Sequence, residues 1–208
     1  MASKDHWERV YSIKAPDQVS WFRPHLETSL ALIDRSAGGT SAAVIDVGGG
    51  ASTLVDDLLE RRYCNLTVLD VSAVALEISR CRLGARADSV HWVEADITLA
   101  DLSPQAYDVW HDRAVFHFLT QSEQRETYFS RLVAALKAGG QAIIGTFGPE
   151  GPSKCSGLDV VRYDAPDLQA EFGERFRLRE SCTEVHETPF GTTQQFLYCR
   201  FQLATHAL

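Results

Sequence analysis

Short apolar runs alternate with amphipathic stretches over residues 42–147. Each run has the length of a buried strand, and most are followed by a stretch with the apolar spacing of a helix. We expect strands at residues 42–47, 65–71, 89–96, 107–112 and 140–147, and helices at 52–62, 72–85 and 122–136. Strands that alternate with helices predict a parallel sheet covered on both faces.

Local signals support these boundaries. Ser72 is placed to cap the helix that follows it, and Gly139-Gly140 form a normal helix stop. Before the first strand, residues 5–14 and 24–36 are expected to be helices. These two helices are joined by a segment that contains Pro16 and the aromatic pair Trp21-Phe22.

The alternation stops in the C-terminal part of the chain. Residues 176–187 and 193–203 both have the pattern of a strand, and a short segment separates them. That spacing predicts an antiparallel hairpin rather than another crossover helix. The expected fold class is therefore α/β, a three-layer sandwich with a mostly parallel seven-stranded sheet that ends in an antiparallel hairpin.

Composition excludes several classes of protein. The 208 residues contain 20 Lys and Arg against 28 Asp and Glu, a net charge of −8, which argues against a broad surface for nucleic acid. No apolar run approaches the roughly 20 residues of a membrane span. The five cysteines form no C-x-x-C pair, so neither a disulfide framework nor a metal site is expected. We expect a cytoplasmic protein, a monomer or a homodimer.

A glycine-rich turn joins the first strand to its helix. It reads Asp46-Val47-Gly48-Gly49-Gly50-Ala51-Ser52-Thr53. Glycines there let the backbone turn tightly and approach a ligand. The dinucleotide pattern G-x-G-x-x-G fails at Thr53, so a dinucleotide oxidoreductase is the weaker alternative. A turn without any ligand is the other alternative.

The order of four segments resembles the class I S-adenosylmethionine-dependent methyltransferases, from about Ala42 to Phe147. VIDVGGG resembles the first motif of that family, LTVLDVS the second and VEADI the third. AYDVWHDRAVFHFLT and LVAALKAGGQAIIG resemble the fourth strand and the turn before the fifth. The chain departs from the family pattern at Ser52, where glycine is frequent, and at Ala138, where proline is usual.

The resemblance implies a cofactor, S-adenosylmethionine, with S-adenosylhomocysteine as its product. Gly48 and Gly50 would pass under the methionine part, with Asp46 near its amino group. Asp70 would accept both ribose hydroxyls, because a carboxylate only accepts and can take two hydrogen bonds. The full set of expected cofactor-binding residues is Asp46, Gly48, Gly49, Gly50, Ser52, Asp70, Val71, Asp96, Ile97 and Trp21.

Acceptor chemistry is expected where the fourth strand ends. His111, Asp112 and Arg113 lie there, and ligands bind at the carboxyl ends of strands in open α/β sheets. The functional interpretation is acceptor positioning, with His111 or Asp112 as a base. The structural interpretation is that Asp112 caps a helix starting at Arg113. His117 is either a second candidate base or a packed side chain that supports the site.

Three regions follow from this interpretation. Residues 1–38 form an N-terminal helical cover, 42–147 a cofactor-binding core, and 148–208 a substrate loop and hairpin, within one domain of 208 residues. The loop at 148–164 is a candidate lid that contains Cys155. The expected function is methyl transfer to a small-molecule nucleophile. A protein lysine methyltransferase and a catalytically silent cofactor-binding module are the alternatives.

Overall fold

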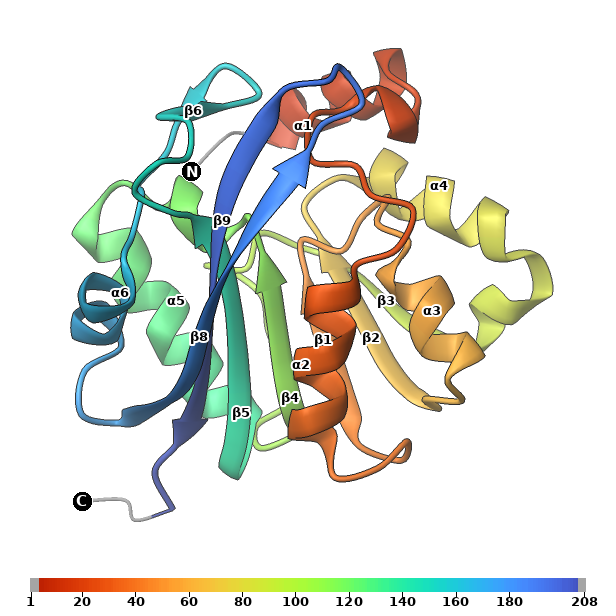
Figure 1. Ribbon diagram of the computed structural model, residues 1–208. Helices are drawn as coiled ribbons and strands as arrows, with labels where there is room; N and C mark the ends of the chain where they lie inside the picture. Colours follow the sequence, from red (N-terminus) through yellow and green to blue (C-terminus); the bar gives the residue numbers. More distant parts are fainter. Residues whose placement is uncertain (1–3, 206–208) are drawn as a thin grey trace.

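A seven-stranded sheet in the order β3-β2-β1-β4-β5-β9-β8 forms the centre of the computed structural model, which describes residues 4–205 (Figure 1). β1 pairs in parallel with β2 and β4, and the parallel register continues outward to β3 and β5. β9 joins β5 antiparallel, and β8 joins β9 antiparallel. The predicted fold class is therefore confirmed, including its C-terminal hairpin.

The strands and helices have the following bounds. The strands are β1 Ala43–Val47, β2 Asn65–Asp70, β3 Val90–Glu94, β4 Tyr107–Arg113, β5 Leu136–Phe147, β6 Lys154–Cys155, β7 Leu158–Asp159, β8 Phe176–Glu187 and β9 Thr193–Leu203. The α-helices are α1 Lys4–Ile13, α2 Glu27–Ala37, α3 Leu54–Glu60, α4 Ala73–Leu83, α5 Ser122–Ala135 and α6 Ala165–Phe172. Short 3₁₀ turns are η1 Pro16–Gln18, η2 Gly84–Ser89 and η3 Phe116–Phe118.

Two apolar cores hold helices to the two faces of the sheet. On one face, Leu32, Leu58 and Leu76 from α2, α3 and α4 pack with Val44 and Ile143 from the strands. On the other face, α5 and α6 pack against the sheet through a core that contains Tyr128, Leu132, Leu168 and Phe172. Successive strand residues point to opposite faces, which explains why nearly continuous apolar strands are needed here.

Several predicted boundaries shift. The helix expected at 24–36 is α2 at Glu27–Ala37, and the helix expected at 52–62 is shortened to Leu54–Glu60. The α-helix considered at Arg113 is absent: β4 runs through Arg113, and only the 3₁₀ turn Phe116–Phe118 follows. The outermost residues of the predicted domain, 1–3 and 206–208, lie outside the described part of the chain.

Two elements were not predicted. α6 lies between the substrate loop and β8, although its sequence carries a start signal: the Asp164 side chain accepts from the Asp167 amide, and Pro166 occupies the first turn. The ribbon β6–β7 has only two residues in each strand, which is too short for a periodic pattern. Among residues 4–205, no helix has the length and apolarity needed to cross a membrane.

Candidate functional site

Two adjoining cavities open at the carboxyl ends of the parallel strands, beside α1 (Figure 1). The first, which we call the strand-end cavity, is lined by the ends of β1, β2 and β4 and by the chain after β3. The second, the glycine-turn cavity, is lined by the turn after β1 and by the segment between η1 and α2. Gly48, Tyr11, Trp21 and Arg113 line both cavities, so they mark the boundary between them.

The glycine-rich turn is packed too closely for side chains. Gly48 has φ 74°, and a Cβ there would collide with Val115. A Cβ on Gly49 would collide with the Asp46 carboxylate, and one on Gly50 with the Asp70 carboxylate. The glycines therefore bring the backbone against two acidic side chains at the floor of the cavities.

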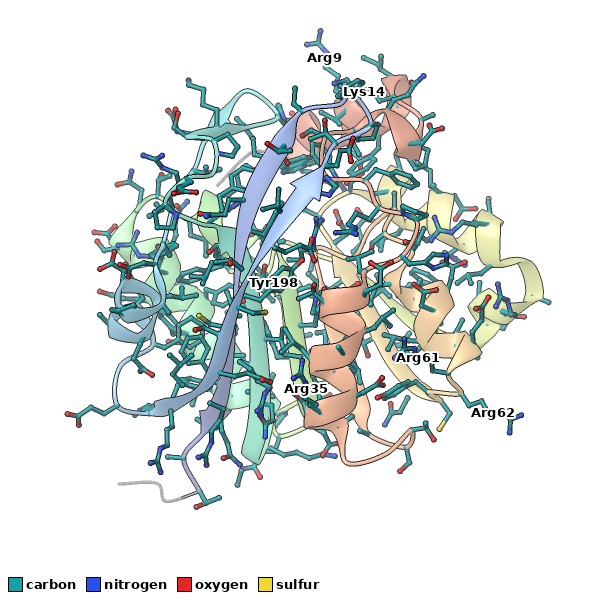
Figure 2. The ribbon with its side chains drawn as sticks, viewed as in Figure 1. Arg9, Lys14, Arg35, Arg61, Arg62 and Tyr198 are labelled. Carbon is teal, nitrogen blue, oxygen red and sulfur yellow. The ribbon has the colours of Figure 1, made fainter. Side chains whose placement is uncertain are left out.

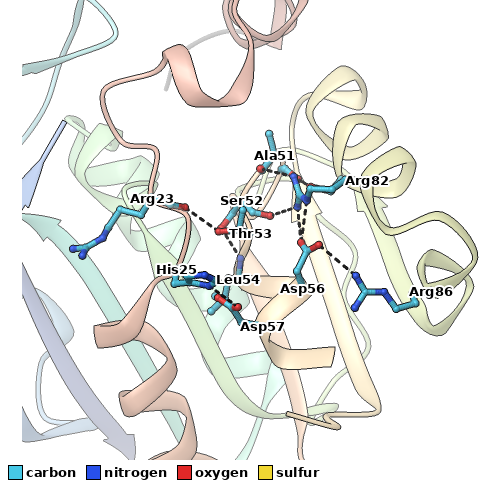
Figure 3. A network of polar contacts seen from close by, with 12 residues as sticks. Arg23, His25, Ala51, Ser52, Thr53, Leu54, Asp56, Asp57, Arg82 and Arg86 are labelled. Carbon is cyan, nitrogen blue, oxygen red and sulfur yellow. Dashed lines mark hydrogen bonds and ion pairs between the residues drawn. The ribbon is translucent and has the colours of Figure 1, made fainter. Parts of the chain in front are cut away.

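A polar network holds this turn against the start of α3 and the side of α4 (Figure 3). The Arg82 guanidinium, from α4, donates to the carbonyl oxygens of Ala51 and Ser52 and pairs with Asp56 at 2.7 Å. The Ser52 hydroxyl accepts from the Leu54 amide at 3.2 Å, so this predicted cofactor residue also starts α3. Ser52 lines the glycine-turn cavity, and its role in binding the cofactor stays a prediction.

Asp70 lies at the end of β2, where it lines the strand-end cavity and is 7% exposed. One of its oxygens accepts from the Ser72 amide at 2.8 Å. Burial, with the negative charges of Asp46 and Glu8, raises the pKa of Asp70 to about 7 despite the backbone amides that favour the charged form. The carboxyl group is therefore partly ionised near neutral pH, and among residues 4–205 no lysine or arginine forms an ion pair with it.

Asp46 and His111 form a buried pair on neighbouring strands. His111 Nδ1 lies 2.7 Å from an Asp46 oxygen, and His111 Nε2 lies 2.9 Å from Ser29 Oγ on α2. Because a carboxylate only accepts, Nδ1 carries a proton, and Nε2 forms a second hydrogen bond with the Ser29 hydroxyl. Both ring nitrogens are thus occupied, and His111 holds Asp46 in place under the glycine turn.

Arg113 extends from the end of β4 to the boundary of the cavities. Its Nε donates to the hydroxyl of Tyr198, which lies midway along β9 (Figure 2), and its Nη1 donates to the Trp21 carbonyl oxygen. The guanidinium carbon sits 4.3 Å from the centre of the Phe196 ring. Nη2 is buried and has no hydrogen-bond partner within residues 4–205.

Asp112 and His117 point into the protein rather than into the cavities. The Asp112 carboxylate is fully buried and accepts from the Val115 and Phe116 amides and from the Tyr128 hydroxyl at 2.6 Å. Burial raises its pKa to about 6. His117 Nδ1 accepts from the Phe147 amide, and burial lowers its pKa to about 3. Neither residue lines either cavity.

Some of the remaining predicted residues line a cavity, and others do not. Val71 and Ile97 line the strand-end cavity, whereas Asp96 does not, and its carboxylate accepts from the amide and hydroxyl of Thr98. Within the loop at 148–164, Cys155 is 4% exposed and lines the strand-end cavity. Burial raises the pKa of its thiol to about 12, so the thiol stays protonated.

Aromatic side chains of the N-terminal segment complete the cavities. Trp7 and Tyr11 from α1 meet Trp21, and Trp7 also contacts Phe118 with ring centres 5.3 Å apart. The Glu8 carboxylate, on the same helix, accepts from the Ala73 and Val74 amides at the start of α4. Trp7, Tyr11 and Trp21 thus border the cavities, and the role of this segment as a cover stays a prediction; the link of α1 to α4 was not foreseen.

Several side chains that contact the site residues were not predicted from the sequence, because they come from distant segments of the chain. Ser29, Tyr198 and Phe196 come from α2 and β9, and nothing in their local sequence marks them as partners of His111 or Arg113. Ala114 has φ 71°, a strained value for alanine, and the turn it makes brings Arg113 and Val115 to the same cavity. Among the described residues, no group of His, Cys, Asp and Glu is placed to hold a metal ion.

Comparison with protein families gives one match, to a family described as methyltransferase domain, over residues 45–142. An uncharacterized methyltransferase of Mycobacterium tuberculosis is 32% identical over 117 residues, which are 56% of this chain and 56% of the relative. The chain thus spans little more than half the length of that relative.

Solved structures share the fold at low sequence identity. A structure described by the conversion of a disulfide bond into a thioacetal group during echinomycin biosynthesis has a TM-score of 0.79 at 18% identity, covering 98% of this chain and 93% of that one. A Burkholderia thailandensis 1,6-didemethyltoxoflavin N1-methyltransferase, holding that compound and S-adenosylhomocysteine, has a TM-score of 0.73 at 17% identity, covering 97% and 87%. The whole described chain therefore has the architecture of these proteins.

Proposed function

We propose that this chain is a class I S-adenosylmethionine-dependent methyltransferase and that it transfers the methyl group of this cofactor to a nucleophilic atom of a small molecule. The observation that carries the proposal is the pair of cavities at the strand ends, with Asp70 in one and the glycine turn in the other. The 1,6-didemethyltoxoflavin methyltransferase with the same fold holds its small molecule together with S-adenosylhomocysteine, which supports the acceptor class.

The cavities fit the cofactor in shape and in chemistry. Asp70 is a buried carboxylate beside the apolar residues Leu69 and Ile97, which suits a ribose diol next to an adenine ring. Gly48 and Gly49 line the glycine-turn cavity without side chains, so a ligand there can approach the backbone of the turn closely. Asp46, fixed by His111, would accept from the ammonium of the amino-acid end.

The acceptor side is narrow and mostly aromatic. Trp7, Tyr11, Trp21 and Phe118 line the strand-end cavity together with Cys155. Aromatic faces attract a cationic sulfonium and pack against flat, apolar molecules. An acceptor enclosed in this way is a small molecule rather than the exposed side chain of a folded protein.

When bound, S-adenosylmethionine supplies an electrophilic methyl group on a good leaving group. The residues of this chain orient the acceptor, and orientation alone supplies about 7–11 kcal/mol in favourable cases. They also exclude water, because α1 and Trp21 cover the cavities. Asp112 and His117 support β4 and β5 from inside and take no part in proton transfer.

Titration with S-adenosylhomocysteine, followed by a screen of small nucleophiles for formation of this product, tests the proposal. We expect binding, and turnover of at least one small nucleophile. Product formation only with protein lysine substrates would replace the acceptor class. Binding without turnover of either kind would favour the silent cofactor-binding module.

A further inference from the structure

Arg113 is the one arginine that borders both cavities, and it lacks an anionic partner. Among residues 4–205, no carboxylate oxygen lies within 4.0 Å of its guanidinium, whereas Arg23, Arg125 and Arg200 each pair with a glutamate. Its contacts are a phenol hydroxyl, a carbonyl oxygen and an aromatic face. A guanidinium presents five donors in a fixed fork and stays charged in any environment.

One nitrogen of the Arg113 guanidinium has no acceptor among residues 4–205. Nη2 is buried and has no partner, while Nε and Nη1 are held by Tyr198 and Trp21. A buried donor without an acceptor costs free energy, and the cost is larger for a charged group. The stack on Phe196, with the two held nitrogens, fixes the orientation of the fork before any ligand arrives.

The opposite charges of the cofactor's amino-acid end find other partners. The glycine-turn cavity contains Asp46, which suits the ammonium, and Arg23, which lines that cavity only. Arg23 already pairs with two glutamates, so a cofactor carboxylate would share its guanidinium with them. Arg113 is therefore available to bind a ligand in the strand-end cavity, which Val115, Phe118 and Cys155 also line. These three neighbours are uncharged. Asp70, at the end of β2, is the acidic residue that lines the same cavity, so an anion beside Arg113 would meet one positive charge and would have to keep clear of this carboxylate.

Resting on the proposed function, we propose that the acceptor carries a carboxylate and that Arg113 binds it. The substrate class is a small, flat acid whose ring packs against Trp7, Tyr11 and Trp21. The carboxylate fixes the orientation of the acceptor, and a nucleophilic atom elsewhere on the molecule faces the methyl group.

Calorimetric titration with benzoate and with benzamide tests this inference, because the two probes differ mainly in charge. With the protein saturated in S-adenosylhomocysteine, we expect benzoate to bind at least tenfold more tightly than benzamide. Arg113→Met should abolish this preference, and Arg113→Lys, which keeps the charge but not the fork, should retain part of it. Arg200→Met, which removes a partly buried arginine paired with Glu180, should leave the preference unchanged.

Equal affinity for the two probes in the wild-type protein, or an unchanged preference in Arg113→Met, would overturn the inference. Folding of each variant is checked by its thermal unfolding, and Arg113→Lys carries the test if Arg113→Met is unfolded.

A second comparison locates the anion: Arg113→Met is titrated with S-adenosylhomocysteine and with 5′-methylthioadenosine, which lacks the amino-acid end. A loss for the first ligand alone would assign Arg113 to the cofactor and overturn the acceptor assignment. Absence of binding by S-adenosylhomocysteine in the wild-type protein would refute the proposed function instead.

Discussion

Single residues at the ends of β2 and β4 show how similar carboxylates acquire different roles. Asp70 and Asp112 are both buried, and burial raises the pKa of each. Asp70 lines the strand-end cavity, whereas Asp112 turns to the amides of Val115 and Phe116 and to Tyr128. The free oxygen of Asp70 is therefore offered to a ligand, and both oxygens of Asp112 are satisfied by the protein itself.

The Asp70 pKa makes ribose binding depend on pH. Ribose hydroxyls donate to the ionised carboxylate, so affinity should be constant above a pH of about 7 and fall toward tenfold per unit below it. Titration with 5′-methylthioadenosine between pH 5.5 and 8.5 measures this, because that ligand carries the ribose without the titratable amino-acid end. Asp70→Asn should bind more weakly at high pH and lose the dependence. A dependence that survives in Asp70→Asn would assign the titration to another group.

Tyr128→Phe should destabilise the fold without changing cofactor affinity. The Tyr128 hydroxyl donates to Asp112 and accepts from Trp110 Nε1 at 2.9 Å, so its loss leaves two buried groups unpaired. A hydrogen bond to a charged group contributes about 1.5–3 kcal/mol to the free energy of unfolding. Denaturant unfolding should show a loss of this size.

The matched control for this prediction is Tyr163→Phe. The Tyr163 hydroxyl is buried and has no hydrogen-bond partner among residues 4–205, so its removal should be neutral or stabilising. Equal losses in the two variants would contradict the structural role assigned to the Tyr128–Asp112 bond.

The sequence predicted three neighbouring residues of β4 as site residues, but it did not predict where their side chains point. His111, Asp112 and Arg113 were predicted together because they follow one another at a strand end. Side chains alternate along a strand, so adjacent residues cannot share one cavity equally. The partners that fix them, Ser29, Tyr128 and Tyr198, lie on other elements and become visible only when the chain is folded.

Among the elements, α1 is attached by partly buried side chains, with Trp7 packed against the core that also holds α2, α3 and α4. None of its residues is buried, and its polar links are Glu8 to the start of α4, Lys4 to Glu94, and His6 to Ser156 at 3.1 Å. Arg9 of α1 and Lys14, which directly follows the helix, point away from the sheet (Figure 2). A helix held in this way can move aside at low cost, which suits a cover over a ligand cavity.

Glu8→Gln should loosen this cover. An acidic side chain at the first turn of α4 complements the helix dipole by up to about 1 kcal/mol, roughly fivefold in an equilibrium constant. We expect faster amide hydrogen exchange in residues 4–13 and a severalfold faster release of S-adenosylhomocysteine. Asp5→Asn, an exposed change on the same helix, should leave both rates as they are. Identical behaviour of the two variants would show that Glu8 does not hold the cover.

Elements with strong periodicity were predicted, and short or locally capped ones were not. The strands of the core are apolar because both sheet faces are covered, so β1, β2 and β4 stood out. α6 has only eight residues and follows an irregular loop, which hid its cap at Asp164. The ribbon β6–β7, with two residues in each strand, depends on tertiary contacts that no sequence window contains.

At the scale of the whole molecule, the strand order explains where the site lies. The chain reverses its direction of winding between β1 and β4, and ligands bind at such a switch point in open α/β sheets. The glycine turn follows β1 and Arg113 ends β4, so the two neighbouring strands bring the turn and the guanidinium together. The division into cover, core and substrate region, the oligomeric state and the compartment stay predictions.

Calorimetric titration of the purified, ligand-free protein with S-adenosylmethionine, S-adenosylhomocysteine and NAD tests the central claim most directly. The glycine turn lacks the third glycine of a dinucleotide site, with Thr53 in its place, and we propose that Asp70, which lines the strand-end cavity, accepts from the ribose of an adenosyl ligand. We predict micromolar binding of both adenosyl compounds and none of NAD. Binding of NAD alone, or of none of the three by folded protein, would contradict the account.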